Sequence, residues 1–342
     1  MASSLESTLT RAWLRRGPLA CALWPVSVPF RLLAALRRGL FRLGVLKSER
    51  LPVPVVVVGN IFIGGTGKTP LTIWLAQQLR EAGLRPGVIS RGHGSAAAQP
   101  RAVDASARAD EVGDEPLLIA ARTGCPVVVA RRRAEAGRHL LQRHPEVDVL
   151  IADDGLQHYA LERDVEVILF DGRGVGNGWT LPAGPLREPP SRRRDFTVVN
   201  APELTPALMQ AVGGRPCQMR LAGEHAERMN DPAQRVALGG FKGRRVLAAA
   251  GIGNPGRFFA MLRASGLEVA ELPLPDHHDF LDDPFRAVDA DVILITEKDA
   301  VKCRQLENIN NDPRLWVVPV TARIDPALAA QIVEKCRGRP TA

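Results

Sequence analysis

A glycine-rich segment between a strand-like run and a helical pattern constrains this chain more than any other feature. Residues 55–58 form an apolar run that leads into the sequence GNIFIGGTGKT, and a helical pattern follows. In such a loop the glycines let backbone N–H groups point at phosphate, a lysine reaches the β and γ oxygens, and a threonine hydroxyl ligates Mg²⁺. We therefore expect a phosphate loop that binds ATP and Mg²⁺, formed by Gly64, Gly65, Thr66, Gly67, Lys68 and Thr69.

The loop departs from the strict G-x-x-x-x-G-K-[ST] pattern at one position. Phe62 stands where that pattern has glycine. The alternative is a glycine-rich turn that joins a strand to a helix without any ligand. Lys68 and Thr69, however, supply the two side chains that the phosphates and Mg²⁺ need, so the nucleotide-binding interpretation is favoured.

After Pro54 the sequence alternates short apolar runs with helix-length segments, which is typical of βα units around a parallel sheet. We expect helices at residues 68–82, 113–123, 131–143 and 255–265. The expected strands are the apolar runs at residues 54–59, 86–90, 126–130, 147–152, 165–170, 196–200, 246–250 and 292–296.

This alternation predicts an α/β fold, with a P-loop NTPase-like parallel sheet domain and a second, smaller α/β domain. An N-terminal membrane-associating helix is expected in addition. A less apolar stretch after residue 222 separates the two sets of βα units. The expected divisions are the N-terminal segment at 1–50, the nucleotide-binding domain at 51–222, a linker at 223–245, and a smaller α/β domain at 246–342.

The positive charge of the chain is concentrated at its N-terminus. The formal net charge is +8, and residues 1–50 hold nine basic and two acidic side chains, a net +7, which leaves +1 for the other 292 residues. Attraction to an anionic surface explains this distribution better than a nucleic-acid groove through the whole fold. We therefore expect an anionic membrane surface as a partner and no nucleic acid.

The N-terminal segment has the pattern of an interfacial helix. Residues 17–30 carry no charge but contain three prolines, and they are shorter than the roughly 20 residues that span a bilayer. On a helix over residues 31–46, one face collects leucines and the opposite face collects arginines. The alternative is that the leucines pack on the protein's own core. The leucines are Leu32, Leu33, Leu36, Leu40 and Leu43, and the arginines are Arg31, Arg38 and Arg42.

Acidic residues follow two of the expected strands and begin one of the expected helices. A phosphate loop needs an acid at the end of a neighbouring strand to hold Mg²⁺ or its water shell. Asp153 and Asp154 end one strand and Asp171 ends another, so the pattern alone leaves the choice open. Asp114 begins a helix, where an N-cap is the better interpretation from the residues alone.

Two further segments carry residues with chemical potential. The PDHHDF segment places His277 and His278 beside acids, but no spaced cysteines or histidines complete a zinc site. A histidine in a substrate cleft is favoured, with a solvated loop as the alternative. The GIGNPG segment from Gly251 matches G-x-G-x-x-G, with Glu271 where a ribose-binding acid would stand. Because the chain already has a better phosphate loop, we interpret this segment as a tight strand-to-helix turn.

Several of these segments together resemble the tetraacyldisaccharide 4'-kinase family, the lipid A 4'-kinases of Gram-negative bacteria. The resemblance extends over most of residues 53–302 in one order, and the family has the GGxGKT form of the loop. The matching segments are GNIFIGGTGKTP from Gly59, SRGHG from Ser90, GDEP from Gly113, DDGLQH from Asp153, LPAGPLREP from Leu181, AGIGNPGRF from Ala250, PDHHDF from Pro275 and TEKDAVK from Thr296.

The resemblance implies that the protein is a kinase that phosphorylates the 4' hydroxyl of a tetraacylated glucosamine disaccharide 1-phosphate with ATP. The product is lipid IVA, so the reaction belongs to lipid A biosynthesis. The resemblance also implies a cleft between two α/β domains and a location at the cytoplasmic face of the bacterial inner membrane, peripheral or monotopic through the N-terminus. No obligate protein partner is expected.

The resemblance also implies roles for individual residues. Asp114 matches the proposed general base, and a histidine of PDHHDF, with His278 preferred over His277, matches its partner. Lys68 binds phosphate. The residues expected near the metal are Thr69, Asp153, Asp154 and Glu188. The residues expected to line the cleft are Arg133, Gln157, His158, Arg187, Glu188 and His277, of which Arg133 and Arg187 are expected to act in catalysis.

Two other functions suit part of the sequence. A membrane-associated P-loop switch or partitioning ATPase would also need GGTGKT and a basic amphipathic helix. A soluble small-molecule kinase is the third possibility, and it would keep full activity on water-soluble acceptors without residues 1–45.

Overall fold

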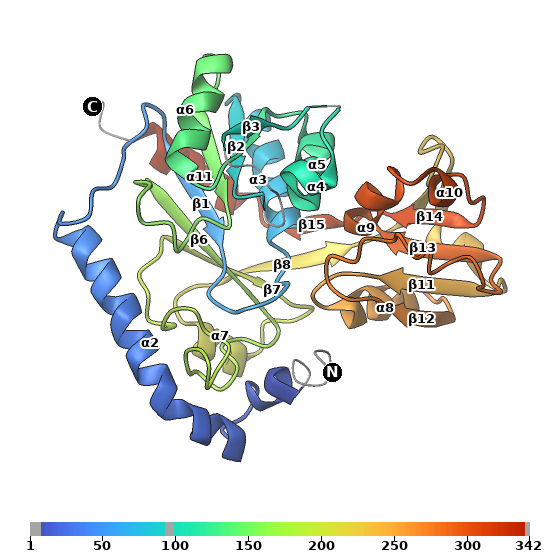
Figure 1. The fold of residues 1–342 in the computed structure, drawn as a ribbon, viewed down its shortest axis with the longest axis horizontal. Coiled ribbons are helices and arrows are strands. Elements are labelled where there is room, and N and C mark those ends of the chain that lie inside the picture. The colour runs from blue at the N-terminus through green and yellow to red at the C-terminus, as the bar shows by residue number, and fades with distance from the viewer. Residues whose placement is uncertain (1–7, 93–98, 105, 339–342) are drawn as a thin grey trace.

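The computed structural model describes residues 8–92, 99–104 and 106–338, and these form two β-sheets with helices packed on both (Figure 1). The α/β fold class predicted from the sequence is confirmed. The larger sheet has nine strands in the described part of the chain, in the spatial order β15 (Thr321–Ile324), β8 (Cys217–Ala222), β7 (Phe196–Asn200), β6 (Val165–Asp171), β1 (Val55–Gly59), β5 (Val149–Asp153), β2 (Pro86–Ser90), β4 (Val127–Val129) and β3 (Arg101–Ala102).

The strands of the larger sheet from β8 to β4 are all parallel, so their carboxyl ends meet at one edge. Strand β1 lies between β5 and β6 and is buried on both faces, which is why it reads as an unbroken run of valines. Alternate valines enter two cores. The helices α3 (Lys68–Glu81), α5 (Asp114–Thr123) and α11 (Ala327–Arg337) cover one face, and α6 (Arg133–Arg143) and α7 (Pro206–Val212) cover the other.

The smaller sheet has six strands among the described residues, in the order β10 (Arg235–Ala237), β9 (His225–Arg228), β14 (Leu315–Val318), β13 (Val292–Thr296), β11 (Val246–Ala250) and β12 (Val269–Pro273). Its parallel core strands are buried between α8 (Pro255–Ala264) with η1 (Leu238–Phe241) on one face and α9 (Glu297–Cys303) with α10 (Glu307–Asn310) on the other. We call each sheet with its helices a lobe, the larger and the smaller.

The structure differs from the expected division of the chain in two places. Residues 223–245 are not a bare linker, because they contain β9, β10 and η1 of the smaller lobe. These strands are short and half-exposed, so they lack the apolar run that marks a buried strand. The C-terminal part of 246–342 returns to the larger lobe, where β15 pairs with β8 and α11 packs on α3.

Helix α2 (Pro18–Arg42) is longer than the expected helix over 31–46, because the apolar segment before Arg31 is also helical. Pro18 lies in the first turn, where proline is tolerated, while Pro25 and Pro29 lie inside the helix. By length and composition alone, α2 is long and apolar enough to cross a membrane. Figure 1 shows it lying along the outside of the larger lobe.

Ser27 connects α2 to the larger lobe by two hydrogen bonds. The Oγ atom of the buried Ser27 donates to the carbonyl of Thr180 at 3.0 Å and accepts from the N–H of Ala183 at 2.9 Å. The leucines face the other way, since Leu32 and Leu36 are 64% and 59% exposed. The alternative that this leucine face packs on the protein's own core is therefore wrong for these residues.

Candidate active site

The phosphate loop connects β1 to α3 at the carboxyl edge of the larger sheet. Gly67 precedes the helix with φ +100°, a left-handed conformation that favours glycine. The Nδ2 atom of Asn60 donates to the carbonyl of Gly64 at 3.2 Å and to Oγ1 of Thr66 at 3.0 Å. The Nδ2 atom of Asn200, at the end of β7, donates to the carbonyl of Thr66 at 2.9 Å. The loop is thus held in shape from both sides.

The departure from the strict loop pattern has a packing reason. Phe62 is only 2% exposed and belongs to the core under the sheet, so its side chain points away from the phosphate side. The guanidinium of Arg173 lies 4.2 Å from the centre of its ring. A large side chain therefore fits here because the loop does not use this position to approach phosphate.

Two neighbouring acids, Asp153 and Asp154, lie beside the loop lysine. The Nζ atom of Lys68 is 3.7 Å from Oδ1 of Asp154 and 3.4 Å from Oδ1 of Asn60. Oδ1 of Asp154 is buried and has no hydrogen-bond partner in the described structure. Although burial opposes it, the charges of Lys68 and the nearby arginines Arg187 and Arg133 lower the pKa of Asp154. A charged carboxylate with a buried oxygen that accepts no hydrogen bond is well suited to bind a cation.

Asp153 and Asp171 have different surroundings. Burial, together with the carboxylates of Glu115 and Asp154, raises the pKa of Asp153 to about 7, and its Oδ1 accepts from the hydroxyl of Thr72 at 3.0 Å. The carboxylate of Asp171 forms an ion pair with Arg173, whose Nη2 lies 2.7 Å from Oδ2. Of the strand-end acids, Asp154 is therefore the one whose oxygen is available beside Lys68.

Arg133 and His158 lie together behind the two acids. The Nη2 atom of Arg133 donates to the carbonyls of Asp153 and Asp154 at 3.1 and 3.2 Å, and burial lowers the pKa of Arg133 to about 10. The backbone N–H of Arg133 donates to Nε2 of His158 at 3.3 Å. Arg133 thus fixes the acid turn, and His158 lies beside it.

Gln157, Arg187 and Glu188 form a second polar group beside the loop. The side chain of Arg187 lies 3.6 Å from Asp154 and 3.5 Å from Oε1 of Gln157. The backbone N–H of Arg187 donates to the carbonyl of Ile61 at 2.7 Å. Arg187 therefore joins the acid turn to the phosphate loop.

The carboxylate of Glu188 is occupied by protein donors. It accepts from Arg192 at 2.6 and 2.7 Å, from the hydroxyl of Tyr159 at 2.6 Å and from Gln157 at 3.0 Å, and Arg38 of α2 lies at 3.2 Å. Although burial opposes it, Arg192 and these hydrogen bonds lower the pKa of Glu188. Such a satisfied carboxylate has no oxygen left for a metal, so the geometry does not support the metal-ligand role expected for Glu188.

The smaller lobe contributes His277, which contacts Asp114 of the larger lobe. Asp114 is the first residue of α5, not its N-cap, which is Gly113. The Nδ1 atom of His277 donates to Oδ2 of Asp114 at 3.1 Å. Lys302 lies 3.5 Å from the same oxygen, and Lys298 lies 3.4 Å from Nε2 of the histidine.

These contacts shift the pKa values of the pair in opposite directions, and both shifts favour the charged forms. Although burial opposes it, the hydrogen bond from His277 and the charges of Lys298 and Lys302 hold the pKa of Asp114 well below its usual range. The same hydrogen bond raises the pKa of His277. Asp114 is therefore held as an anion, and His277 is the member of the pair whose pKa lies above its ordinary value.

The preference for His278 as the partner of Asp114 is wrong. His277 has φ +61°, which turns its side chain toward the larger lobe, whereas His278 points back into its own loop. Nδ1 of His278 accepts from the N–H of Phe280 at 3.0 Å, and its ring packs edge-on against that of Phe280 at 4.8 Å. His278 thus stabilises the loop that carries His277.

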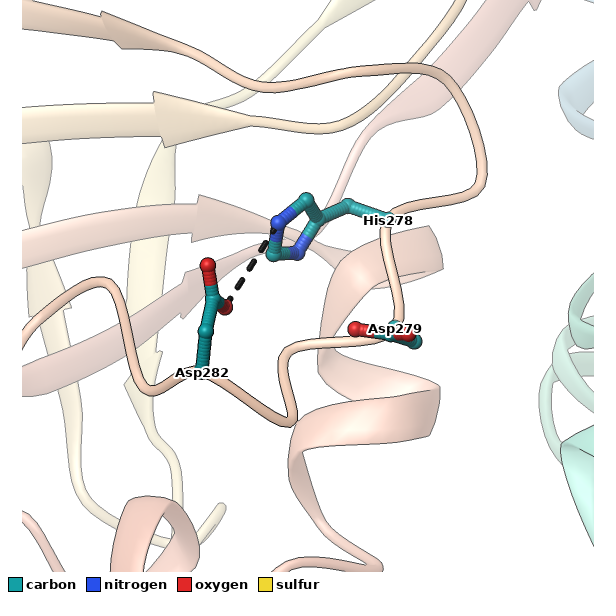
Figure 2. A group of neighbouring side chains, drawn as sticks. All are labelled: His278, Asp279 and Asp282. Carbon is teal, nitrogen blue, oxygen red and sulfur yellow. Dashed lines mark ion pairs between the residues drawn. The ribbon is translucent and has the colours of Figure 1, made fainter.

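Figure 2 shows His278 together with Asp279 and Asp282 on this loop. One potential ligand atom from each lies within 4.8 Å of the others, an arrangement that superficially suits a metal. In a neutral ring whose Nδ1 accepts a hydrogen bond, however, the proton resides on Nε2, which faces Asp282 at 3.6 Å. In that ring the nitrogen facing Asp282 carries a hydrogen and has no lone pair for a metal, so the cluster is interpreted as a polar contact within the loop.

The G-x-G-x-x-G segment of the smaller lobe meets the phosphate loop directly. A Cβ atom added at Gly253 would lie 2.9 Å from the backbone nitrogen of Gly65. The Nη2 atom of Arg257, in the helix that follows, donates to the carbonyl of Asn200 at 3.1 Å. The segment is a tight turn, as expected, and its second glycine permits the two loops to touch.

Several polar residues of the site were not identified from the sequence. Their common feature is a hydrogen bond or ion pair to a predicted site residue: Asn60, Thr72, Tyr159, Arg192, Asn200, Lys298 and Lys302. Asn60 and the two lysines lie within segments that carry the family resemblance, GNIFIGGTGKTP and TEKDAVK, so that resemblance was the signal that could have found them.

Known proteins are similar to this chain over almost its whole length. Residues 19–337 match the LpxK family, described as tetraacyldisaccharide-1-P 4'-kinase. The chain is 62% identical to the tetraacyldisaccharide 4'-kinase of Janthinobacterium sp. (strain Marseille), with 99% of each chain covered. It is 60% identical to that of Herminiimonas arsenicoxydans, with 99% of this chain and 98% of the relative covered.

A solved structure is also similar to this fold. The crystal structure of an "apo" form of LpxK from Aquifex aeolicus in complex with ATP matches with a TM-score of 0.74 and 29% sequence identity, covering 93% of this chain and 99% of that one. The family match spans both lobes and the greater part of α2, and the relatives cover almost the full chain. The chain therefore belongs to the tetraacyldisaccharide-1-P 4'-kinase family.

Proposed function

We propose that this protein transfers the γ-phosphoryl group of ATP to the 4' hydroxyl of a tetraacylated glucosamine disaccharide 1-phosphate, a step of lipid A biosynthesis. The observation that carries the proposal is the Asp114–His277 pair, which joins the smaller lobe to the start of α5. The next residue, Glu115, is near enough to Asp153 for its charge to raise the pKa of that acid. A switch ATPase orients water and needs no such base between two lobes. Family membership likewise disfavours that alternative.

ATP fits the phosphate loop through backbone N–H groups and Lys68. The residues that would hold Mg²⁺ are Thr69, through its hydroxyl, and Asp154, whose buried free oxygen supports this role. When bound, Mg²⁺ neutralises charge on the β and γ phosphates. Asp153, with its raised pKa and its hydrogen bond from Thr72, supports the turn and is the weaker candidate for direct ligation.

His277, with Asp114 behind it, is the better candidate for the group that takes the proton of the sugar hydroxyl. Although burial opposes it, the hydrogen bond from His277 and the charges of Lys298 and Lys302 keep Asp114 ionised, so its own basicity is low. The imidazole gains basicity from that carboxylate. With Nδ1 donating to Asp114, Nε2 is the nitrogen that would take the proton, in place of its present contact with Lys298 at 3.4 Å. This revises the expectation that Asp114 is itself the base. Asp114 instead fixes the ring and stabilises its charged form.

Positioning and charge supply the remainder of the catalysis. Arg187 and Lys68 both flank Asp154 and would offset charge on the transferring group. Arg133, Gln157 and His158 shape the acceptor side of the site. Since Gly253 touches Gly65, we also propose that the smaller lobe closes the cleft over the nucleotide.

Helix α2 supports the location that we propose for the protein, the cytoplasmic face of the inner membrane. Its exposed leucines and the excess of basic residues at the N-terminus suit an anionic bilayer, and ATP is available on the cytoplasmic side. The hydrogen bond from Ser27 to Thr180 keeps α2 against the protein. It therefore favours a helix that lies along the membrane interface over one that spans the bilayer.

The test is an assay of purified protein with ATP, Mg²⁺ and tetraacyldisaccharide 1-phosphate in mixed micelles, read by mass spectrometry of the lipid. The lipid should gain one phosphate at the 4' position. ATP hydrolysis without a phosphorylated lipid, stimulated by a protein partner, would support the switch ATPase instead. Phosphorylation of water-soluble acceptors without α2 would support a soluble kinase.

A further inference from the structure

Helix α9 carries two lysines, Lys298 and Lys302, to which the chemistry described so far gives only the role of nearby charges. They are four positions apart and therefore lie one turn apart on the same side of the helix. Helix α9 belongs to the smaller lobe and packs against α5 of the larger lobe, which begins at Asp114 (Figure 1). Both ammonium groups lie near the Asp114–His277 pair, but their contacts differ in kind.

Lys302 contacts the backbone of the histidine loop and the side chain of Asp114. Its Nζ atom donates to the carbonyl of His277 at 2.9 Å and to the carbonyl of His278 at 3.1 Å, and it lies 3.5 Å from Oδ2 of Asp114. An ammonium has three N–H donors, so these three oxygens match it in number. One mostly buried ammonium therefore joins the chain at His277 to Asp114 across the two lobes.

The backbone of His277 needs support of this kind. Its φ of +61° is a left-handed conformation that costs free energy in a residue with a Cβ atom, so surrounding contacts must maintain it. The N–H of His277 donates to the carbonyl of Gly251 at 3.2 Å, and the N–H of Gly251 donates to the carboxylate of the buried Asp299, also in α9. Helix α9 thus holds the chain on both sides of His277, and Lys302 is the contact that also reaches the larger lobe.

Lys298 contacts side chains instead. Its Nζ atom lies 3.3 Å from Oε1 of Glu115, 3.3 Å from Oδ1 of Asp276 and 3.4 Å from Nε2 of His277. The hydrogen bond with Asp114 raises the pKa of His277, and the charge of Lys298 opposes that rise. Lys298 therefore acts on the imidazole as a charge.

We propose that Lys302 is a positioning residue, which holds His277 in the orientation that lets Nδ1 donate to Asp114. This inference rests on the proposed function, in which His277 takes the proton of the acceptor hydroxyl. Lys302 acts through the histidine and not on the reacting atoms, because its ammonium is engaged by the two backbone carbonyls and by Asp114.

A positioning role and a purely electrostatic role predict opposite shifts of the pKa of His277 when the ammonium is removed. If Lys302 supplied only charge, Lys302→Met would raise that pKa, because a nearby cation disfavours the imidazolium. If Lys302 positions the ring, the variant loses the hydrogen bond to Asp114. That bond is the main contact that raises the pKa of His277, so the pKa should fall toward its ordinary value.

NMR titration of the histidine side chains measures this shift in the full-length protein without any lipid. The signal of His277 is identified by its absence in His277→Gln. Lys302→Met should lower the pKa of His277 by roughly 1 pH unit. Lys298→Met is the matched control one turn earlier on α9, and it should raise that pKa because it removes a cation and leaves the carbonyl contacts in place. The other charged groups around the ring, Asp276 and Glu115, are the same in both variants.

Steady-state kinetics provide a second readout. Lys302→Met should lower kcat about 10- to 100-fold, leave the KM for ATP unchanged and move the acid limb of kcat to lower pH. Lys298→Met should move the same limb to higher pH. Lys302→Arg keeps the charge and the N–H donors, so it should recover most of kcat and the native pKa of His277. Lys302→Gln is a second neutral variant, for use if Lys302→Met melts too early to titrate, and it should shift the pKa in the same direction.

Two results would overturn the inference. A rise in the pKa of His277 in the neutral variants of Lys302 would show that this lysine acts through its charge alone. An unchanged pKa would show that the lysine does not hold the ring against Asp114. A native protein that phosphorylates no lipid would refute the proposed function by itself, whereas the NMR titration would still report whether Lys302 positions His277.

Discussion

The Nδ1 atom of His277 lies 3.1 Å from Oδ2 of Asp114, although the two residues are 163 positions apart and belong to different lobes. Asp114 begins α5 on the larger lobe, and His277 lies in the loop after β12 of the smaller lobe. The pair therefore exists only when the lobes are together. The base proposed here would be assembled only with the lobes in contact, and this would limit proton transfer to water.

The pH dependence of turnover should report this pair. Because Asp114 raises the pKa of His277, kcat should fall as pH drops through that raised pKa, where the imidazole is already protonated. Asp114→Asn should move this acid limb to lower pH, since the ring loses its anionic partner, and should lower the plateau of kcat by about 10²-fold. Steady-state kinetics from pH 5 to pH 9 would measure both effects.

The same pH profile of kcat tests whether Asp114 has only a capping role. If the carboxylate only supported the start of α5, Asp114→Asn would leave kcat and the acid limb in place. Asp114→Ala would then cost about 1 kcal/mol in the free energy of unfolding and nothing else.

His278 provides a matched control for His277. We expect His278→Gln to leave the acid limb where it is and to lower the free energy of unfolding by about 1 kcal/mol, because its role is the hydrogen bond from Phe280. His277→Gln should instead reduce kcat by roughly 10²- to 10⁴-fold, the range of general base catalysis. Zn²⁺ could also be added to the native protein and to His278→Gln. A rise in melting temperature in the native protein alone would contradict the interpretation that His278, Asp279 and Asp282 bind no metal.

Loss of the loop lysine should abolish turnover. Lys68→Ala removes the ammonium that offsets charge on the transferring phosphate, which is worth about 3–5 kcal/mol of transition-state stabilisation, or roughly 10² to 10⁴ in rate. The fold should survive, because within the described residues the polar contacts of the lysine ammonium are with Asn60 and Asp154, at the site and not in the core. A variant with more than half of the native activity would refute the phosphate-loop assignment.

Sequence patterns located the parallel strands well and the contacts between distant segments poorly. The strands at 86–90, 196–200 and 246–250 match the structure because buried parallel strands are continuous apolar runs. Strands β9 and β10 were missed because half-exposed edge strands show no such run. The choice between His277 and His278 depended on one positive φ angle, which a sequence of two adjacent histidines does not encode.

The contact between the lobes can be tested at Gly253. Gly253→Ala would place a methyl group 2.9 Å from the backbone of Gly65, so either the lobes stay apart or the phosphate loop shifts. Overpacking of this kind costs about 1–3 kcal/mol, and we expect kcat/KM for ATP to fall roughly tenfold or more. Gly256→Ala is the control, because its nearest neighbour would be 3.8 Å away. Equal effects of the two variants would show that the close approach does not matter.

Membrane binding should depend on the leucine face of α2. Leu33 and Leu36 are 67% and 59% exposed, so replacing both by Asp removes apolar burial in the bilayer without disturbing the core. The variant should leave liposomes at every salt concentration, its KM for the lipid acceptor should rise, and its KM for ATP should not change. Replacing Arg31 and Arg42 by Gln should weaken binding mainly at low salt, by about 1 kcal/mol per charge.

Co-sedimentation with phosphatidylglycerol liposomes, read beside a melting curve, separates membrane binding from packing. Arg38 is unsuitable for this test because it pairs with Glu188 at 3.2 Å, so its loss would disturb the polar group beside the phosphate loop. Leu40 is half-buried, and Leu40→Asp should lower the melting temperature, unlike the change at Leu33 and Leu36. A Leu33 and Leu36 variant that still sediments with liposomes but melts earlier would place this face against protein, and the membrane role of α2 would be wrong.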